Sequence, residues 1–294
     1  MNKIPVGKTI KYAYTFTFEN LGAIIGLIWI PTVLITVGGF FAETSFGTAI
    51  VSAMRENRPA VAGQAMISLL AWYFVSLLLT AVASAAVSRQ ALGLRKGPAV
   101  AHFALGPAEF RVFGAELALF GVLLALAIPY LAVLSSVVTY IEAGGAAATI
   151  SSFVAAALAV GGICLMLLVV VRLSFLLVPA TIAENAVALA RSWALTRGNF
   201  WRIVAVGLCT FGPIVLVLAA GEYAILGPHY FELSMSTSTD AAVQAKIAAE
   251  QTQIVMDHLP MSFGLSLLMA PFYFGLLLAP SAYAYRALSG QPAP

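Results

Sequence analysis

The sequence predicts an all-α membrane protein with six transmembrane helices. Hydrophobic residues fill 61% of its 294 positions and charged residues 9%, against about 25% charged residues in soluble domains. A helix needs about 20 apolar residues to cross a bilayer, and six runs are long enough. They cover approximately residues 21–42, 65–87, 113–141, 148–179, 203–226 and 261–285. No soluble domain fits between them, so we expect a single membrane domain over residues 1–294.

A recurring feature, which we call the elbow, predicts how the six spans are grouped. In the stretch 184–201 it is a short amphipathic helix that lies in the membrane interface and leads into the fifth span. Its apolar face comprises Val187, Ala190, Ala194 and Leu195. Trp193 and Trp201 are typical of the headgroup boundary, where an indole ring is buried and its N–H stays hydrated. The alternative is an ordinary cytoplasmic loop helix.

The elbow pattern repeats about every 90 residues. Each of Leu21, Phe110 and Phe200 has an aromatic residue seven positions before it, an apolar residue five before it and a polar residue one before it. The three sets are Tyr14, Phe16 and Asn20; Phe103, Leu105 and Glu109; Trp193, Leu195 and Asn199. This period predicts three elbow-plus-hairpin units, approximately 5–92, 93–183 and 184–288, related by a pseudo-threefold axis.

Basic residues predict the orientation of the bundle, because Lys and Arg are retained on the cytoplasmic side of a membrane. Eleven lie at the termini and in the segments before the third and fifth spans: Lys3, Lys8, Lys11, Arg89, Arg95, Lys96, Arg111, Arg191, Arg197, Arg202 and Arg286. The opposite loops hold Arg55, Arg58 and Lys246. Both termini and all three elbows are therefore expected to be cytoplasmic.

In the first unit, an elbow at residues 5–20 precedes a span that contains Pro31. Thr44–Arg55 is expected to form an outer interfacial helix that ends near Pro59. The second span carries a hydroxyl side chain at every fourth position. This stripe comprises Ser76, Thr80, Ser84 and Ser88. Small hydroxyl residues favour close helix packing, and a water-lined path is the alternative.

The second unit begins with a turn at 93–98, and its elbow is interrupted by Pro107. Only residues 142–147 join its two spans, so these form a tight hairpin. Glu116 and Arg172 lie inside this hairpin near its cytoplasmic end. Three interpretations stay open: an ion pair between them, an Arg172 side chain that reaches the interface alone, or contact with a ligand.

The third unit has a long outer connection, about residues 227–260. Asp240 is expected to cap a helix there, and this helix would lie across the outer mouth of the bundle as a surface cap or as a gate. At the inner face, Arg191, Arg197 and Arg202, with Trp193 and Trp201, are candidate contacts for anionic lipid headgroups.

The segment from Val178 to Glu184 and the following run from Arg191 to Trp201 resemble a known family. They are similar to the membrane domain of glycerophosphoryl diester phosphodiesterases and of related six-span bacterial inner-membrane proteins of unknown function. The resemblance implies a bacterial inner-membrane location. Some members of the family join this domain to a soluble phosphodiesterase barrel, for which this chain has no room, so the resemblance implies no enzymatic activity here.

The sequence predicts no catalytic, cofactor or metal site. His102, His229 and His258 lie in different segments without metal-ligand spacing, and the basic residues form no nucleic-acid patch. Two classes of function remain. The first is a non-enzymatic structural or accessory membrane protein that binds lipid, a protein partner or a second copy of itself. The second is a transporter or channel for a lipid or small amphiphile, which the hydroxyl stripe and the proline-interrupted spans would suit.

Overall fold

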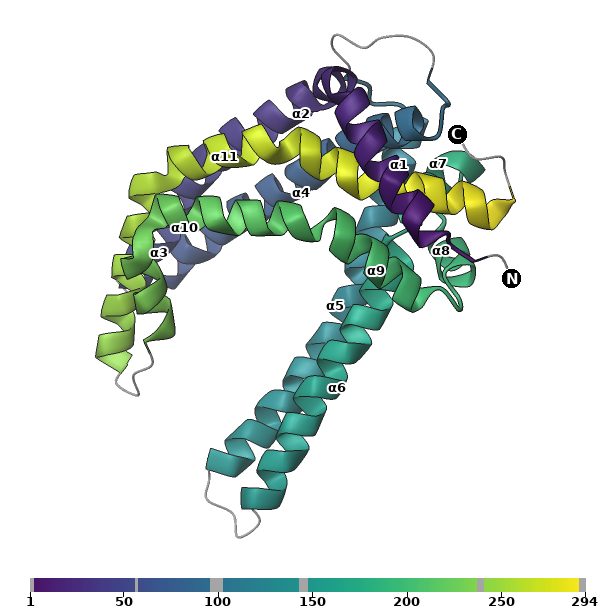
Figure 1. Cartoon of the computed structure of the whole chain (residues 1–294). Helices are drawn as coiled ribbons and strands as arrows, with labels where there is room; N and C mark the ends of the chain where they lie inside the picture. Colours follow the sequence, from purple (N-terminus) through teal and green to yellow (C-terminus); the bar gives the residue numbers. More distant parts are fainter. Residues whose placement is uncertain (1–2, 56–57, 96–102, 143–147, 237–240, 291–294) are drawn as a thin grey trace.

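The computed structural model describes residues 3–55, 58–95, 103–142, 148–236 and 241–290, and within them the secondary structure is helical, with no strand. Among them are six helices long and apolar enough to cross a membrane. The prediction of an all-α protein with six helices of spanning length is confirmed, and this result is compatible with a multi-pass membrane protein. Figure 1 shows the helices as three successive hairpins, α2 with α4, α5 with α6, and α10 with α11.

The first unit begins with an elbow helix, as expected. Helix α1, Val6–Glu19, ends at Asn20, and helix α2, Leu21–Ala42, starts on the next residue. Asn20 has φ −108° and ψ 17°, which interrupts the helical path and separates the elbow from the span. The side-chain Nδ2 of Asn20 donates to the Phe16 carbonyl oxygen (2.9 Å) and caps the end of α1.

The outer segment of this unit is also helical. A π-helical turn, η1 (Glu43–Gly47), leads from α2 into α3, Thr48–Arg55. Helix α4, Pro59–Ala91, then crosses back, and Pro59 opens it. Proline suits this first position because its missing N–H would have no partner there.

In the second unit Pro107 begins a helix, whereas the sequence predicted that it interrupts one. Pro107 starts helix α5, Pro107–Glu142, and does not interrupt an elbow. Residues 103–106, the part of the expected elbow that is described, are not helical. Helix α6, Ala148–Ser174, ends earlier than predicted, and a short turn separates it from α7, Leu177–Glu184.

In the third unit the predicted elbow is shorter and the predicted fifth span is broken. The elbow helix is α8, Leu189–Leu195, followed by α9, Phe200–Thr210, and α10, Gly212–Met235. The break between α9 and α10 lies at Phe211. The outer helix and the sixth span form one helix, α11, Ala241–Ser289, and Asp240 lies outside the described residues.

The buried core lies at one end of the bundle. It is built from the starts of α2, α5 and α9, the ends of α4 and α11, and α7. Figure 1 shows both chain ends, α1, α7 and α8 gathered at this end, while the α5–α6 hairpin runs away from the other two. The most apolar stretch of α5 contains no buried residue. The hairpin is therefore joined to the protein at its base, and its outer part presents apolar side chains to the surroundings.

The N-terminal segment ties the first unit to the third. Ile4 is fully buried, its N–H donates to Asn199 Oδ1 (3.1 Å), and its carbonyl oxygen accepts from Arg202 Nη1 (2.8 Å). Tyr14 on α1 also donates its hydroxyl to the Cys209 carbonyl oxygen at the end of α9 (2.7 Å). The two elbows thus form one structure at the core end.

Candidate functional site

A cavity of about 250 Å³ lies where the second hairpin joins the rest of the protein. Its walls come from α4, α5, the end of α6, α7, α11 and the turn before α7. The polar lining comprises Thr80, Ser84, Glu116, Ser174, Tyr273 and Ser281. The apolar lining comprises Leu119, Phe175, Leu177, Val178, Pro179, Phe274, Leu277 and Leu278. One cavity therefore combines an ionisable group, several hydroxyls and an apolar wall.

Glu116 is the acidic group of this cavity. It stands one helical turn after Val112, a fully buried residue of α5, so the same face of the helix carries it inward. The Ser84 hydroxyl on α4 is within hydrogen-bonding reach of its carboxyl group. The Oε2 atom, however, is buried and has no hydrogen-bond partner among the residues that the structure describes. A carboxyl oxygen in that position is costly unless something else in the cavity satisfies it.

Three other hydroxyls of the cavity, those of Thr80, Ser174 and Ser281, face it as acceptors. Thr80 donates to the carbonyl oxygen of Ser76 (2.8 Å), and Ser174 and Ser281 donate to carbonyl oxygens of their own helices, at 2.6 and 2.8 Å. A hydroxyl has one proton and two acceptor lone pairs, so these oxygens keep only acceptor capacity. No Lys or Arg is among the described lining residues. The cavity is therefore rich in acceptors and lacks a positive charge.

The predicted hydroxyl stripe of α4 contributes only its middle to this site. Thr80 and Ser84 line the cavity. Ser76 does not, and its hydroxyl donates to the Tyr73 carbonyl oxygen (2.8 Å). Ser88 is fully buried among core residues, and its Oγ has no hydrogen-bond partner in the described part of the chain. The middle of the stripe thus lines a cavity and Ser88 packs in the core, while a water-lined path stays a prediction.

The structure does not bring Arg172 to Glu116. Arg172 Nη2 donates to the carbonyl oxygen of Trp193 (2.7 Å), and the guanidinium carbon lies 3.7 Å from the centre of the Trp193 ring. The reason is helical geometry. Ser174 faces the cavity, and residues two positions apart on a helix point about 200° apart, so Arg172 points the other way, towards α8.

Helix α8 packs against the protein through polar residues. Ser192 within α8 and Thr196 just after it are fully buried, whereas Val187, before the helix, is 50% exposed. The Ser192 hydroxyl donates to the Leu173 carbonyl oxygen (2.8 Å), and Thr196 Oγ1 lies 3.1 Å from the Arg172 carbonyl oxygen. The last carbonyls of a helix have no partner within it. The polar face of α8 turns inward because it satisfies these groups at the end of α6.

The candidate headgroup residues have different surroundings. Arg191 forms an ion pair with Glu184 (2.8 Å), and Arg202 is bound to the Ile4 carbonyl oxygen. Arg197 is exposed and makes no ion pair with any residue that the structure describes. Trp201 is 78% exposed and Trp193 38%. Two of the three predicted cations are thus already engaged within the protein.

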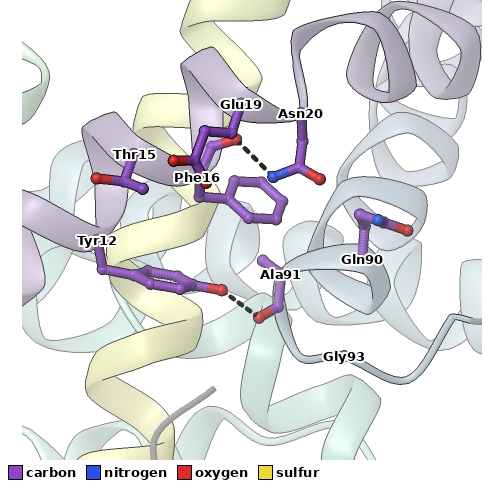
Figure 2. Close-up of a pocket in the computed structure, with 8 residues that line it drawn as sticks. All are labelled: Tyr12, Thr15, Phe16, Glu19, Asn20, Gln90, Ala91 and Gly93. Atoms are coloured by element: carbon purple, nitrogen blue, oxygen red, sulfur yellow. Dashed lines mark hydrogen bonds between the residues drawn. The ribbon is translucent and has the colours of Figure 1, made fainter.

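A second cavity, of about 270 Å³, lies between α1 and the end of α4. At the edge of this cavity the Tyr12 hydroxyl donates to the Ala91 carbonyl oxygen (2.8 Å), as Figure 2 shows. Burial raises the pKa of Tyr12 to about 12, although the charge of Arg286 acts in the opposite direction. Its acidic residue, Glu19, is exposed. This cavity has no buried polar atom without a partner among its described lining, so we place the candidate site at Glu116.

Several polar residues of the spans were not predicted from the sequence. Ser174, Tyr273 and Ser281 line the Glu116 cavity from segments that looked uniformly apolar. Glu222, on α10, accepts a hydrogen bond from Ser262 of α11 (2.9 Å). An isolated acidic residue in an apolar run is a signal that could have identified Glu222. No group of three metal-ligating side chains occurs in the parts of the chain that are described.

No protein-family model, no curated protein and no solved structure matches this chain. The fold therefore defines the class: an all-helical protein with six helices able to cross a membrane.

Proposed function

We propose that this protein is a non-enzymatic membrane protein that binds the cationic head of an amine-bearing lipid or other amphiphile in the Glu116 cavity. The observation that carries this proposal is the unsatisfied Oε2 atom of Glu116 among hydroxyl acceptors, with no basic residue in the cavity lining. An ammonium group supplies three donors and a positive charge. It would satisfy both the carboxylate and the hydroxyl oxygens.

The size and the second wall of the cavity support an amphiphile. About 250 Å³ is below the roughly 300–1,000 Å³ of pockets that enclose whole drug-sized ligands. It accommodates a headgroup. The hydrocarbon chain would run along the apolar wall, where Leu119 and Leu277 are positioned, and out towards the exposed surface of the second hairpin.

The test measures ligand binding to the protein in lipid nanodiscs, with the increase in thermal stability as the readout. Dodecylamine should stabilise the protein, and dodecanol, which has the same chain without the charge, should not. Glu116→Gln removes the charge and keeps the shape. Because a hydrogen bond to a charged group contributes about 1.5–3 kcal/mol, it should weaken dodecylamine binding by roughly 10- to 100-fold.

Glu222→Gln is the matched control. Glu222 is also an acidic residue of a span that accepts a serine hydroxyl, but it lies in the third hairpin and outside the cavity. Dodecylamine binding should be unchanged in this variant. Equal binding by wild type and Glu116→Gln would refute the proposal, and so would an equal loss in both variants.

A transporter or channel for an amphiphile is the second candidate. Two features favour it: the break between α9 and α10 at Phe211, and the non-helical Gly227 inside α10 (φ 77°, ψ 164°). Broken helices are typical of transporter spans that move or line a path. Flux of dodecylamine across proteoliposomes would separate this function from binding alone.

We further propose the location and symmetry that the sequence predicts. The protein would lie in a bacterial inner membrane with both termini cytoplasmic, as in the six-span proteins that it resembles. Helices α2 and α9 both start directly after an asparagine, Asn20 and Asn199, which supports a common unit in the first and third positions. The second unit and the pseudo-threefold axis stay predictions, as do a protein partner and a homo-oligomer.

A further inference from the structure

Two arginines lie together beside α8, at the end of the spans where the elbows gather. Arg172 comes from the last turn of α6, and Arg197 follows α8. Thr196, the residue before Arg197, places its Oγ1 atom 3.1 Å from the Arg172 carbonyl oxygen, so the two arginines lie on neighbouring stretches of chain. Arg172 is held by the Trp193 carbonyl oxygen and the Trp193 ring, so its guanidinium has a fixed position.

No described acidic residue balances these two charges. Glu184, the acidic residue nearest in sequence, already accepts from Arg191 (2.8 Å) and from the Tyr285 hydroxyl (3.1 Å). Arg172 Nε is buried and has no hydrogen-bond partner in the described residues. Arg197 is exposed. The pair thus combines an excess of positive charge with unused donors, which is the composition of an anion site.

We propose that Arg172 and Arg197 bind the phosphate group of an anionic phospholipid. Guanidinium groups bind phosphate oxygens through paired, charge-assisted hydrogen bonds. The surface beside the pair favours a lipid as the source of the phosphate. Helices α6 and α9 pack together and expose Leu167 and Leu208, at 55% and 68%. Acyl chains attached to the phosphate would cover them.

This inference rests on the proposed membrane location and is separate from the proposed binding of an amine. Neither arginine lines the Glu116 cavity, and the ligand has the opposite charge. The two proposals therefore use different probes, phosphatidylglycerol here and dodecylamine there. Either can fail without the other.

The experiment is native mass spectrometry of the purified protein after mixing with equal amounts of phosphatidylglycerol and phosphatidylcholine. The wild type should retain phosphatidylglycerol preferentially, since the choline ammonium would be repelled by the arginines. Arg197→Gln changes an exposed residue and leaves the α6–α8 contacts in place. It should lower phosphatidylglycerol retention about fivefold, the effect of one basic residue at an anionic surface. Arg172→Lys should also lower retention, because lysine cannot form the paired hydrogen bonds.

Arg191→Gln is the control, because Arg191 lies on the adjacent helix α8 but is engaged by Glu184. Its phosphatidylglycerol retention should equal that of the wild type. The proposal is overturned if Arg197→Gln retains the lipid fully, or if Arg191→Gln loses as much. A final arm adds millimolar inorganic phosphate. Displacement of the lipid by phosphate that itself stays bound would identify a free-phosphate site and overturn the lipid assignment.

Discussion

The ion pair between Arg89 and Glu109 gives the sharpest stability prediction. Glu109 lies in the first turn of α5, and its side chain is 2% exposed, whereas that of Arg89, at the end of α4, is 36% exposed. Arg89 Nη1 lies 3.0 Å from Glu109 Oε1, and the Gly106 N–H donates to Oε2 (3.1 Å). The two partners thus differ in how much water they can recover if the other is removed.

This difference predicts unequal effects of removing each partner. Arg89→Leu leaves a buried carboxylate without its counter-charge, which costs about 3–5 kcal/mol. Glu109→Gln keeps an oxygen for the Gly106 N–H and leaves an arginine that still reaches water. It should cost only about 1–2 kcal/mol, the difference between a charged and a neutral hydrogen bond. The free energy of unfolding should therefore fall much further in Arg89→Leu.

The double variant Arg89→Leu/Glu109→Gln provides the decisive comparison. It has no buried charge left, so it should be more stable than Arg89→Leu alone by about 1–3 kcal/mol. The assay is equilibrium unfolding in mixed micelles with increasing amounts of a denaturing detergent. A double variant no more stable than Arg89→Leu would show that the carboxylate is not stranded, and the reasoning from burial would be wrong.

Two further predictions concern packing and pH. A Cβ atom on Gly38 would lie 2.0 Å from a Trp72 ring carbon, whereas Gly22, on the same helix, has open space around it. Gly38→Ala should therefore lower the unfolding free energy by about 1–3 kcal/mol. Gly22→Ala, the control, should not lower it. Tyr12→Phe removes the bond to Ala91, at a cost of about 1 kcal/mol near neutral pH. Because the pKa of Tyr12 rises from 10.0 to about 12 in the folded protein, the unfolded chain loses this proton first as pH increases. Wild-type stability should thus fall between about pH 10 and 12, and the wild type should lose its stability advantage over Tyr12→Phe. A stability difference that stays constant with pH in thermal unfolding would contradict the raised pKa of Tyr12.

Composition and local residue order were sufficient for the helical class and for some of the places where helices begin. Apolar runs of spanning length predict transmembrane helices because the bilayer fixes the length that each must have. The elbow before the first span and the start of α9 at Phe200 were likewise predictable, because a polar residue that interrupts an apolar run marks a boundary. Pro107 was misassigned, because proline both ends helices and begins them, and only the neighbouring structure distinguishes the two.

The sequence singled out Glu116, Thr80 and Ser84, which line the cavity, but only the tertiary structure decided which polar residues meet there. A span in lipid is apolar on all sides, so its hydrophobic period does not indicate which face meets protein. Ser174 and Arg172 illustrate this: two residues apart on one helix, they face the Glu116 cavity and α8 respectively. The inward polar face of α8 depends in the same way on the unpaired carbonyls at the end of α6. The sequence by itself determined that this chain is a six-span helical protein, and the rotation and packing of each helix decided which of its few polar groups meet.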